Sequence, residues 1–79
     1  MIKVLHLEKS EDFKNLISEG TVLVDFFATW CRPCQMLGPV LDEVSEEVDF
    51  KIVKVDVDQF TELAVEYQVR SIPTMVKFE

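Results

Sequence analysis

The sequence is poor in several residues on which small proteins often rely. Only two cysteines occur in 79 residues, which excludes the framework of several disulfides that is common in small secreted domains. Glycine is also scarce, because two are present where an average usage of about 7 % would give roughly five or six. A single histidine leaves little material for a metal site built from imidazoles.

Basic side chains are few, and long hydrophobic runs are missing. Eight basic residues oppose 15 acidic ones, and the formal charge of −7 repels phosphate backbones and anionic membrane surfaces. We expect neither a nucleic-acid nor a membrane partner; the charge serves solubility or, alternatively, steers basic partners. No run approaches the roughly 20 apolar residues that span a bilayer, and no signal peptide is recognisable. The expected location is cytoplasmic, where the thiol pool keeps cysteines reduced.

What is present indicates one compact α/β domain over residues 1–79. Apolar residues make up 48 % and charged residues 29 % of the chain, the balance of a globular protein. The apolar patterns predict strands at 2–7, 22–28, 51–57 and 74–78, with a helix in each interval. The resulting order, β-α-β-α-β-α-β, implies a mainly parallel sheet. The segment 22–28 is apolar on both faces, as expected of a central strand.

Particular residues are expected to begin, bend and bury the helices. Ser10 and Asp58 are predicted N-caps, and Gly20 is predicted to close the first helix. The second helix begins near Cys34 and should bend, but not end, at Pro39. Its predicted apolar face carries Leu37, Val40, Leu41, Val44 and Val48. Four phenylalanines are assigned to the core: Phe26, Phe27, Phe50 and Phe60.

The two cysteines are separated by two residues, in the stretch Trp30-Cys31-Arg32-Pro33-Cys34. A strand passes into a helix there, so that the first thiol lies at a helix N-terminus, where unpaired N–H groups and the helix dipole stabilise a thiolate. We therefore predict that Cys31 is a nucleophile. Cys34, one turn further along, is placed to attack a mixed disulfide formed by Cys31.

The cysteine pair alone is ambiguous, because the same spacing supplies half of a zinc site. Zinc needs four ligands, yet no second pair of cysteines exists and His6 lies on the first predicted strand. A metal or iron-sulfur site would therefore have to bridge two copies of the chain. A purely structural disulfide is a further alternative.

Several motifs follow one another in an order and at spacings that are found together in a known protein family. The run from Val24 to Cys34 is followed by Pro39, by the strand Val53 to Asp58 and by the turn Ser71-Ile72-Pro73-Thr74. Together they resemble the thioredoxin family over essentially the whole chain. The resemblance implies a three-layer α/β/α sandwich and a reductase of protein disulfides with no bound cofactor. It also implies that a thioredoxin reductase drawing on NADPH reduces the oxidised form.

The resemblance assigns catalytic roles to an acid and a lysine. Asp25 lies in an otherwise apolar strand, where burial should raise its pKa, and it matches the acid that assists proton transfer at the second cysteine. Lys54 matches the lysine that accompanies this acid. The alternatives are a carboxylate merely satisfied by hydrogen bonds and a solvated strand lysine.

The resemblance also predicts a substrate-binding surface. Pro73 matches a cis-proline that faces the cysteines, although trans is the default for an X-Pro bond. Trp30, Arg32, Pro33 and Ile72 complete the surface, with a core position as the alternative for Trp30.

The sequence departs from the family pattern in two places. Arg32 stands where the commonest motif has glycine, and a cation beside Cys31 should make the couple less reducing. Members of the family also continue through a final strand and helix, whereas this sequence ends at Glu79. We therefore expect Thr74 to Phe78 to form an exposed edge that favours instability or self-association. The alternative function is that of a non-catalytic or misfolding-prone fragment.

Overall fold

Four strands in the order β1-β3-β2-β4 form the centre of the computed structural model, which describes residues 4–79. The strands are β1 (Val4–His6), β2 (Val22–Phe27), β3 (Lys51–Asp56) and β4 (Thr74–Phe78). They alternate with a short 3-10 helix, η1 (Ser10–Asp12), and with α1 (Phe13–Ile17), α2 (Arg32–Glu47) and α3 (Thr61–Glu66). The predicted order of strands and helices is confirmed. Ile2, predicted to begin the first strand, lies outside the described residues.

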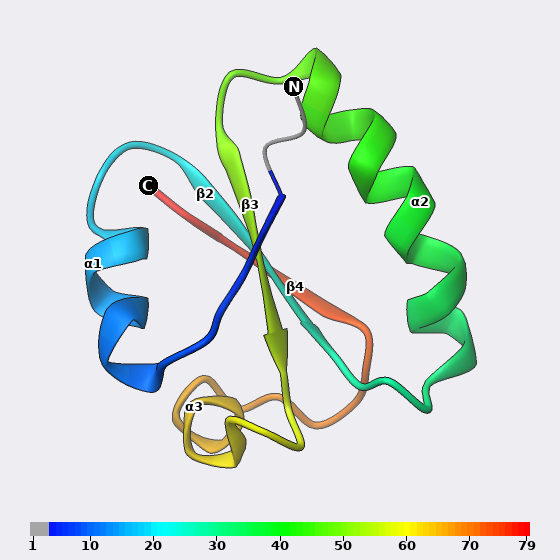
Figure 1. Ribbon diagram of the computed structural model, residues 1–79. Coiled ribbons are helices and arrows are strands. Elements are labelled where there is room, and N and C mark those ends of the chain that lie inside the picture. The colour runs from blue at the N-terminus through cyan, green and yellow to red at the C-terminus, as the bar shows by residue number, and fades with distance from the viewer. Residues whose placement is uncertain (1–3) are drawn as a thin grey trace.

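The sheet is mixed and has a helical layer on each face. β1, β3 and β2 run parallel to one another, whereas β4 is antiparallel to β2. α2 lies over one face, and α1 and α3 lie against the other (Figure 1). This arrangement is the predicted three-layer α/β/α sandwich. β2 pairs on both sides and is central, as its apolar sequence requires.

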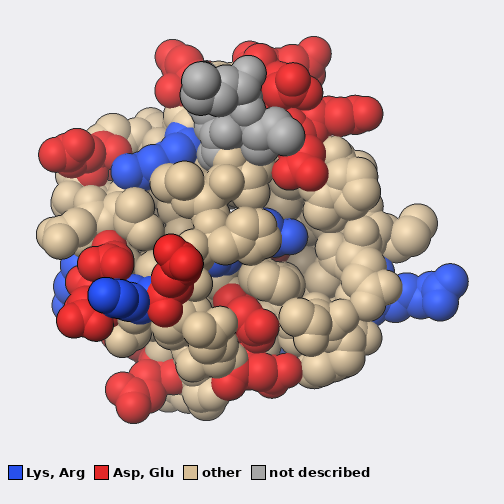
Figure 2. Space-filling model, in the orientation of Figure 1, with Lys and Arg blue, Asp and Glu red and all other residues tan. Residues whose placement is uncertain are grey.

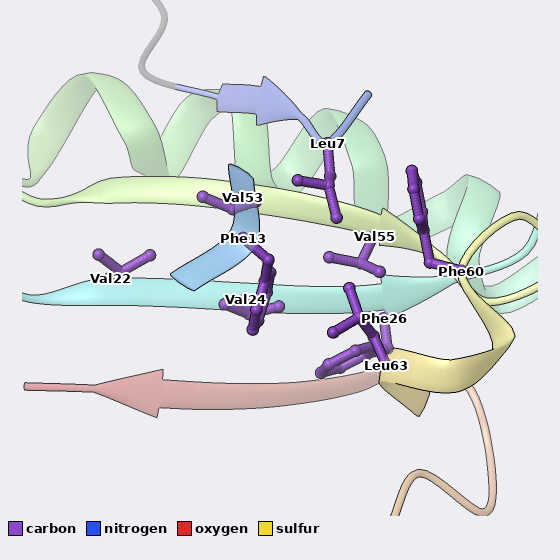
Figure 3. Packing of buried hydrophobic residues seen from close by; sticks show 9 residues of the cluster. All are labelled: Leu7, Phe13, Val22, Val24, Phe26, Val53, Val55, Phe60 and Leu63. Atoms are coloured by element: carbon purple, nitrogen blue, oxygen red, sulfur yellow. The ribbon is translucent and has the colours of Figure 1, made fainter. Parts of the chain in front are cut away.

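The main core lies on the face of the sheet that α1 and α3 cover (Figure 3). Alternate residues of β2 and β3 point into it, since successive side chains of a strand face opposite sides. Val24, Phe26, Val55 and Phe13 are fully buried there. The residues in between, Asp25 among them, point to the opposite face, which α2 covers. One face of the sheet therefore carries the core, and the other is available for the chemistry.

Both predicted caps are wrong. Ser10 is the first residue of η1 instead of its cap, and neither η1 nor α1 has a side-chain cap. α3 begins at Thr61, three residues after Asp58, and is likewise uncapped by a side chain. The first helix ends at Ile17, and Gly20 turns the chain afterwards with a φ of +69°.

Three residues predicted for the core or for the apolar face of the second helix lie elsewhere. Phe50 is only half-buried and belongs to neither buried cluster. Val40 is 51 % exposed, because the buried positions of α2 are Cys34, Leu41 and Ser45. Phe27 is only half-buried and packs beside the cysteines instead of in the main core. As predicted, α2 does not end at Pro39, and the helix continues to Glu47.

The surface agrees with the composition. Acidic side chains are scattered over the face shown in Figure 2 and outnumber the basic ones there. Of the helices among residues 4–79, none has the length and apolar character needed to cross a membrane.

Candidate functional site

Cys31 is the N-cap of α2, and its sulfur takes part in the cap. The Sγ of Cys31 accepts a hydrogen bond of 3.2 Å from the backbone N–H of Cys34. Pro33, in the first turn, has no N–H to leave unpaired, which favours the start of a helix at this point. The positive end of the helix is thus directed at Cys31 Sγ, where a negative charge on the sulfur is stabilised.

Cys31 and Cys34 are joined by a disulfide, with their Cα atoms 5.2 Å apart. Both side chains are almost completely buried, at 4 % and 2 % exposure. They form a small apolar cluster with Ala28, against which Phe27 and Ile72 pack. The Cα separation lies within the range that a disulfide normally spans.

The segment before β4 lies against this disulfide. The peptide bond between Ile72 and Pro73 is cis, so the predicted isomer is confirmed. The carbonyl oxygen of Ile72 lies 3.9 Å from Cys31 Sγ. Residues more than 40 positions apart in the sequence thus meet at one sulfur, as the resemblance implied.

Trp30 is exposed and held at one end. Its ring is 68 % exposed, so the alternative of a core position is wrong. The indole Nε1–H donates a 2.7 Å hydrogen bond to Oδ2 of Asp58. Asp58 is itself fixed, because its backbone N–H donates to Oδ1 of Asp56. The acid predicted to cap α3 instead positions the tryptophan beside the disulfide.

Two shallow apolar depressions adjoin the dithiol. One lies beside Trp30 and Ile72 and includes Arg70 on its border. The other is almost wholly apolar and is lined by Pro33, Pro73 and the exposed side chains Met36, Val40 and Met75, with Arg32 at its border. The predicted binding residues therefore divide between two surfaces.

Asp25 lies on the α2 side of β2 and is fully buried. Burial raises the pKa of Asp25 above its ordinary value, because desolvation penalises the carboxylate, and nearby Lys54 offsets the rise only in part. Neither carboxylate oxygen has a hydrogen-bond partner among the described residues. Within residues 4–79, the alternative that Asp25 is merely satisfied by hydrogen bonds is therefore wrong.

Lys54 pairs with this acid from the neighbouring strand. Its Nζ lies 3.8 Å from Oδ2 of Asp25, and its side chain is only 12 % exposed. The alternative of a solvated strand lysine is therefore wrong. The ammonium lies beneath α2 at Gly38, since a Cβ built at that glycine would be 3.7 Å from Lys54 Nζ. Gly38 is one turn beyond Cys34 in the same helix.

Metal ligands do not gather at the site. Within residues 4–79, no group of three or more histidine, cysteine or acidic side chains is placed to hold an ion. His6 lies on β1, on the far side of β3 from the strand that leads to the cysteines.

The structure thus arranges the nine predicted site residues in two groups. Trp30, Arg32, Pro33, Ile72 and Pro73 surround the cysteines, while Asp25 and Lys54 lie beneath α2. Two residues were missed. Asp58 was interpreted as a cap, and Phe27 as core; both act through partners remote in sequence, which periodicity does not reveal.

Comparison with known proteins gives consistent results. The sequence model of the family described as Thioredoxin matches residues 3–79. A thioredoxin of Mycoplasmoides gallisepticum is 45 % identical over 76 residues, which cover 94 % of this chain and 76 % of that protein. A thioredoxin of Staphylococcus epidermidis is 49 % identical over 70 residues, covering 86 % of this chain and 67 % of the relative.

Solved structures show the same fold. The thioredoxin of Schistosoma mansoni superposes with a TM-score of 0.91 at 39 % identity, over 98 % of this chain and 74 % of that one. A thioredoxin of Nicotiana alata gives a TM-score of 0.92 at 31 % identity, over 99 % and 73 % of the two chains.

Proposed function

Because this chain belongs to the thioredoxin family, we propose that it reduces protein disulfides with Cys31 as the attacking thiol and Cys34 as the resolving thiol. The chain is a thiol-disulfide oxidoreductase, and disulfide-containing proteins are its class of substrate. The observation that carries the assignment of roles is the cap of α2, in which Cys31 Sγ accepts the N–H of Cys34.

The reaction consists of two exchanges. The Cys31 thiolate attacks one sulfur of a substrate disulfide, which breaks the S–S bond, forms a mixed disulfide and releases one substrate thiolate that takes a proton from water. Cys34 then loses its proton and attacks Cys31 Sγ, which breaks the mixed disulfide and releases the second substrate thiolate, and this thiolate also takes a proton from water. The substrate gains two electrons and two protons overall, and the protein is left with the Cys31–Cys34 disulfide.

Asp25 is the proposed acceptor of the Cys34 proton. Its raised pKa suits the role, because a base works best when its pKa is near the operating pH. Lys54 lies 3.8 Å from the carboxylate and favours its charged form between turnovers.

The substrate strand is proposed to bind across Trp30, Ile72 and Pro73, with Arg32 and Pro33 at the border. Trp30 offers a largely exposed ring that Asp58 holds in place. The Ile72 carbonyl, next to Cys31, is placed to accept a hydrogen bond from the backbone of an extended substrate. The proposed source of electrons is a thioredoxin reductase that uses NADPH, with no cofactor bound by this chain, and the proposed location is the cytoplasm.

The test is reduction of insulin disulfides by the purified chain with dithiothreitol as the electron source. We expect turnover well above that of free dithiothreitol, and none with Cys31→Ser. Cys34→Ser should accumulate a mixed disulfide with the substrate, visible by mass spectrometry. A wild-type chain no faster than dithiothreitol would favour the alternative of a non-catalytic fragment.

A further inference from the structure

The ring of Phe27 lies against the ammonium of Lys54. The Nζ of Lys54 is 4.5 Å from the centroid of the ring, within the roughly 6 Å over which an aromatic face attracts a cation. Phe27 is half-buried and also packs against the cluster of Ala28, Cys31 and Cys34. One side chain therefore packs against the cluster that contains the cysteines and also against the cation that accompanies the buried acid.

The register of the sheet explains this contact. Lys54 of β3 lies directly opposite Asp25 of β2. Phe27 is two residues further along β2 and so points to the same face, diagonally across from Lys54. The ammonium is thereby placed between a carboxylate and an aromatic ring of one strand, and the backbone of α2 at Gly38 lies above it.

The ion pair by itself fixes the lysine weakly. Its 3.8 Å separation exceeds hydrogen-bond length, and neither oxygen of Asp25 has a hydrogen-bond partner among residues 4–79. A lysine side chain has four rotatable methylene links and a flexible head, so a second attraction is needed to hold it in one place. The face of Phe27 supplies that attraction in an environment where little water competes.

We propose that Phe27 is a positioning residue that holds the Lys54 ammonium against Asp25 and thereby sets how readily Asp25 accepts the proton of Cys34. This inference rests on the proposed function, since it concerns the proton step of that reaction. A chain that lacks the ring lets the lysine move away from the carboxylate. The carboxylate then loses a favourable charge and takes up a proton more readily.

The side chains that neighbour this pair come from β1, β3, β4 and α2, and only those of β1 and β3 are titratable. His6 of β1 meets the Phe27 ring edge-on, with 6.4 Å between ring centroids. Asp56 of β3 lies opposite Phe27, and its Oδ1 accepts the N–H of Asp58. β4 places the uncharged Met75 opposite Asp25, and α2 presents the backbone of Gly38. His6→Gln is therefore a control that removes the imidazole beside Phe27.

The experiment follows the side-chain carboxyl carbon of Asp25 by NMR through a pH titration of the reduced protein. Phe27→Leu keeps an apolar side chain without a ring face, and we expect it to raise the pKa of Asp25 above the wild-type value. Phe27→Tyr keeps the ring and should leave that pKa unchanged, as should His6→Gln. Near-UV circular dichroism confirms that each variant is folded.

A double mutant separates positioning from packing. In Lys54→Met the cation is gone, so a further Phe27→Leu change should leave the pKa of Asp25 where Lys54→Met alone puts it. If Phe27→Leu shifts this pKa equally in both backgrounds, the ring acts by excluding water and the proposal is overturned. A downward shift, or no shift, in the wild-type background would overturn it as well.

A second route avoids dependence on the folding of Phe27→Leu. Trifluorinated phenylalanine introduced at position 27 alone keeps the shape of the ring while weakening its attraction for cations. We expect the pKa of Asp25 to rise, together with the midpoint of the pH profile for resolution of a mixed disulfide. An unchanged titration would contradict the proposal, whereas insulin reduction by the wild-type chain tests the proposed function separately.

Discussion

At the scale of single residues, Arg32 is the charge nearest in sequence to the attacking thiol. It is exposed at the first position of α2, directly after the capping Cys31. A cation there favours the thiolate, and stabilising the reduced form makes the couple more oxidising. Arg32→Gly should therefore lower the reduction potential by roughly 5 to 20 mV, the size of a modest effect of an exposed charge.

Equilibration of both proteins against one glutathione buffer, followed by alkylation of the free thiols, measures this difference. Arg32→Lys is the matched control, because it keeps the charge and should keep the potential. A wild-type protein that is more reducing than Arg32→Gly would show that the loss of glycine flexibility outweighs the charge.

Asp25 makes the stability of the fold depend on pH. Its folded pKa lies above the unfolded value of 3.8, so the protonated acid favours the folded state. That contribution is fully present below pH 3.8 and is lost as the pH rises through the raised folded pKa. Asp25→Asn does not titrate, and its stability relative to wild type should therefore increase over this window.

The expected gain is about 1.4 kcal/mol for each pKa unit by which the fold raises Asp25. Urea unfolding of both proteins at pH 4 and pH 8, monitored through the single tryptophan, measures it. A difference that is equal at the two pH values, or larger at pH 4, would mean that burial does not dominate over Lys54.

The residue roles differ in how far sequence could predict them. Cys31, Cys34 and Asp25 were identifiable because their local setting is unusual: a close thiol pair at a strand-to-helix junction and an acid in an apolar strand. Asp58 and Phe27 were misassigned. Asp58 accepts a hydrogen bond from Trp30, 28 positions away, and the ring of Phe27 contacts the ammonium of Lys54 on another strand. Such pairings follow from register, which a single sequence does not fix.

At the scale of helices and strands, the presence of each helix or strand was easier to predict than the residues at which it begins and ends. Long apolar patterns fixed the four strands and α2, whereas η1, α1 and α3 have three to six residues each and no side-chain caps. Short helices of this kind are held by packing against the sheet instead of by their own signals. Phe13 and Leu63 supply that packing from α1 and α3, and so cap residues were poor guides to where these helices begin.

The two glycines serve different purposes, and substitution by alanine should distinguish them. Gly38 lies inside α2, where an added Cβ would meet Lys54 Nζ at an ordinary contact distance of 3.7 Å. Alanine is favoured over glycine in a helix by up to about 1 kcal/mol, so Gly38→Ala should stabilise the protein by roughly 0.5 to 1 kcal/mol. Gly20 has a φ of +69°, and Gly20→Ala should cost about 1 to 2 kcal/mol despite free space around it.

Denaturant unfolding of the two variants beside wild type provides the measurement, and each variant serves as the control for the other. Destabilisation by Gly38→Ala would indicate that the lysine cannot yield to the methyl group. The pKa of Asp25 in that variant would then show whether Lys54 had been displaced.

At the scale of the whole molecule, the two faces of the sheet have different roles. The α1 and α3 face buries valines and aromatic rings, and the α2 face holds an unbonded acid, its lysine and the dithiol. Such a division is predictable in outline, because a strand that is apolar except for one acid must bury that acid on one particular face. Sequence alone did not predict which face buries Asp25 or that β4 runs antiparallel to β2. Both depend on the packing of helices that are too short to predict well.

This division predicts how cooperatively the molecule opens. β2 and β3 are paired on both sides and supply most of the core, whereas β1 and β4 lie at the edges. Amides of β2 and β3 should therefore exchange with deuterium only through global unfolding, while those of β4 that point away from β2 exchange much faster. Asp25→Asn, by stabilising the folded state at neutral pH, should slow exchange in β2 and β3 by about tenfold for each 1.4 kcal/mol gained. It should leave those β4 amides unchanged. Equal slowing in all four strands would mean that the edge strands open only when the whole molecule unfolds. The sheet would then be a single cooperative unit, without edge strands that open more easily than β2 and β3.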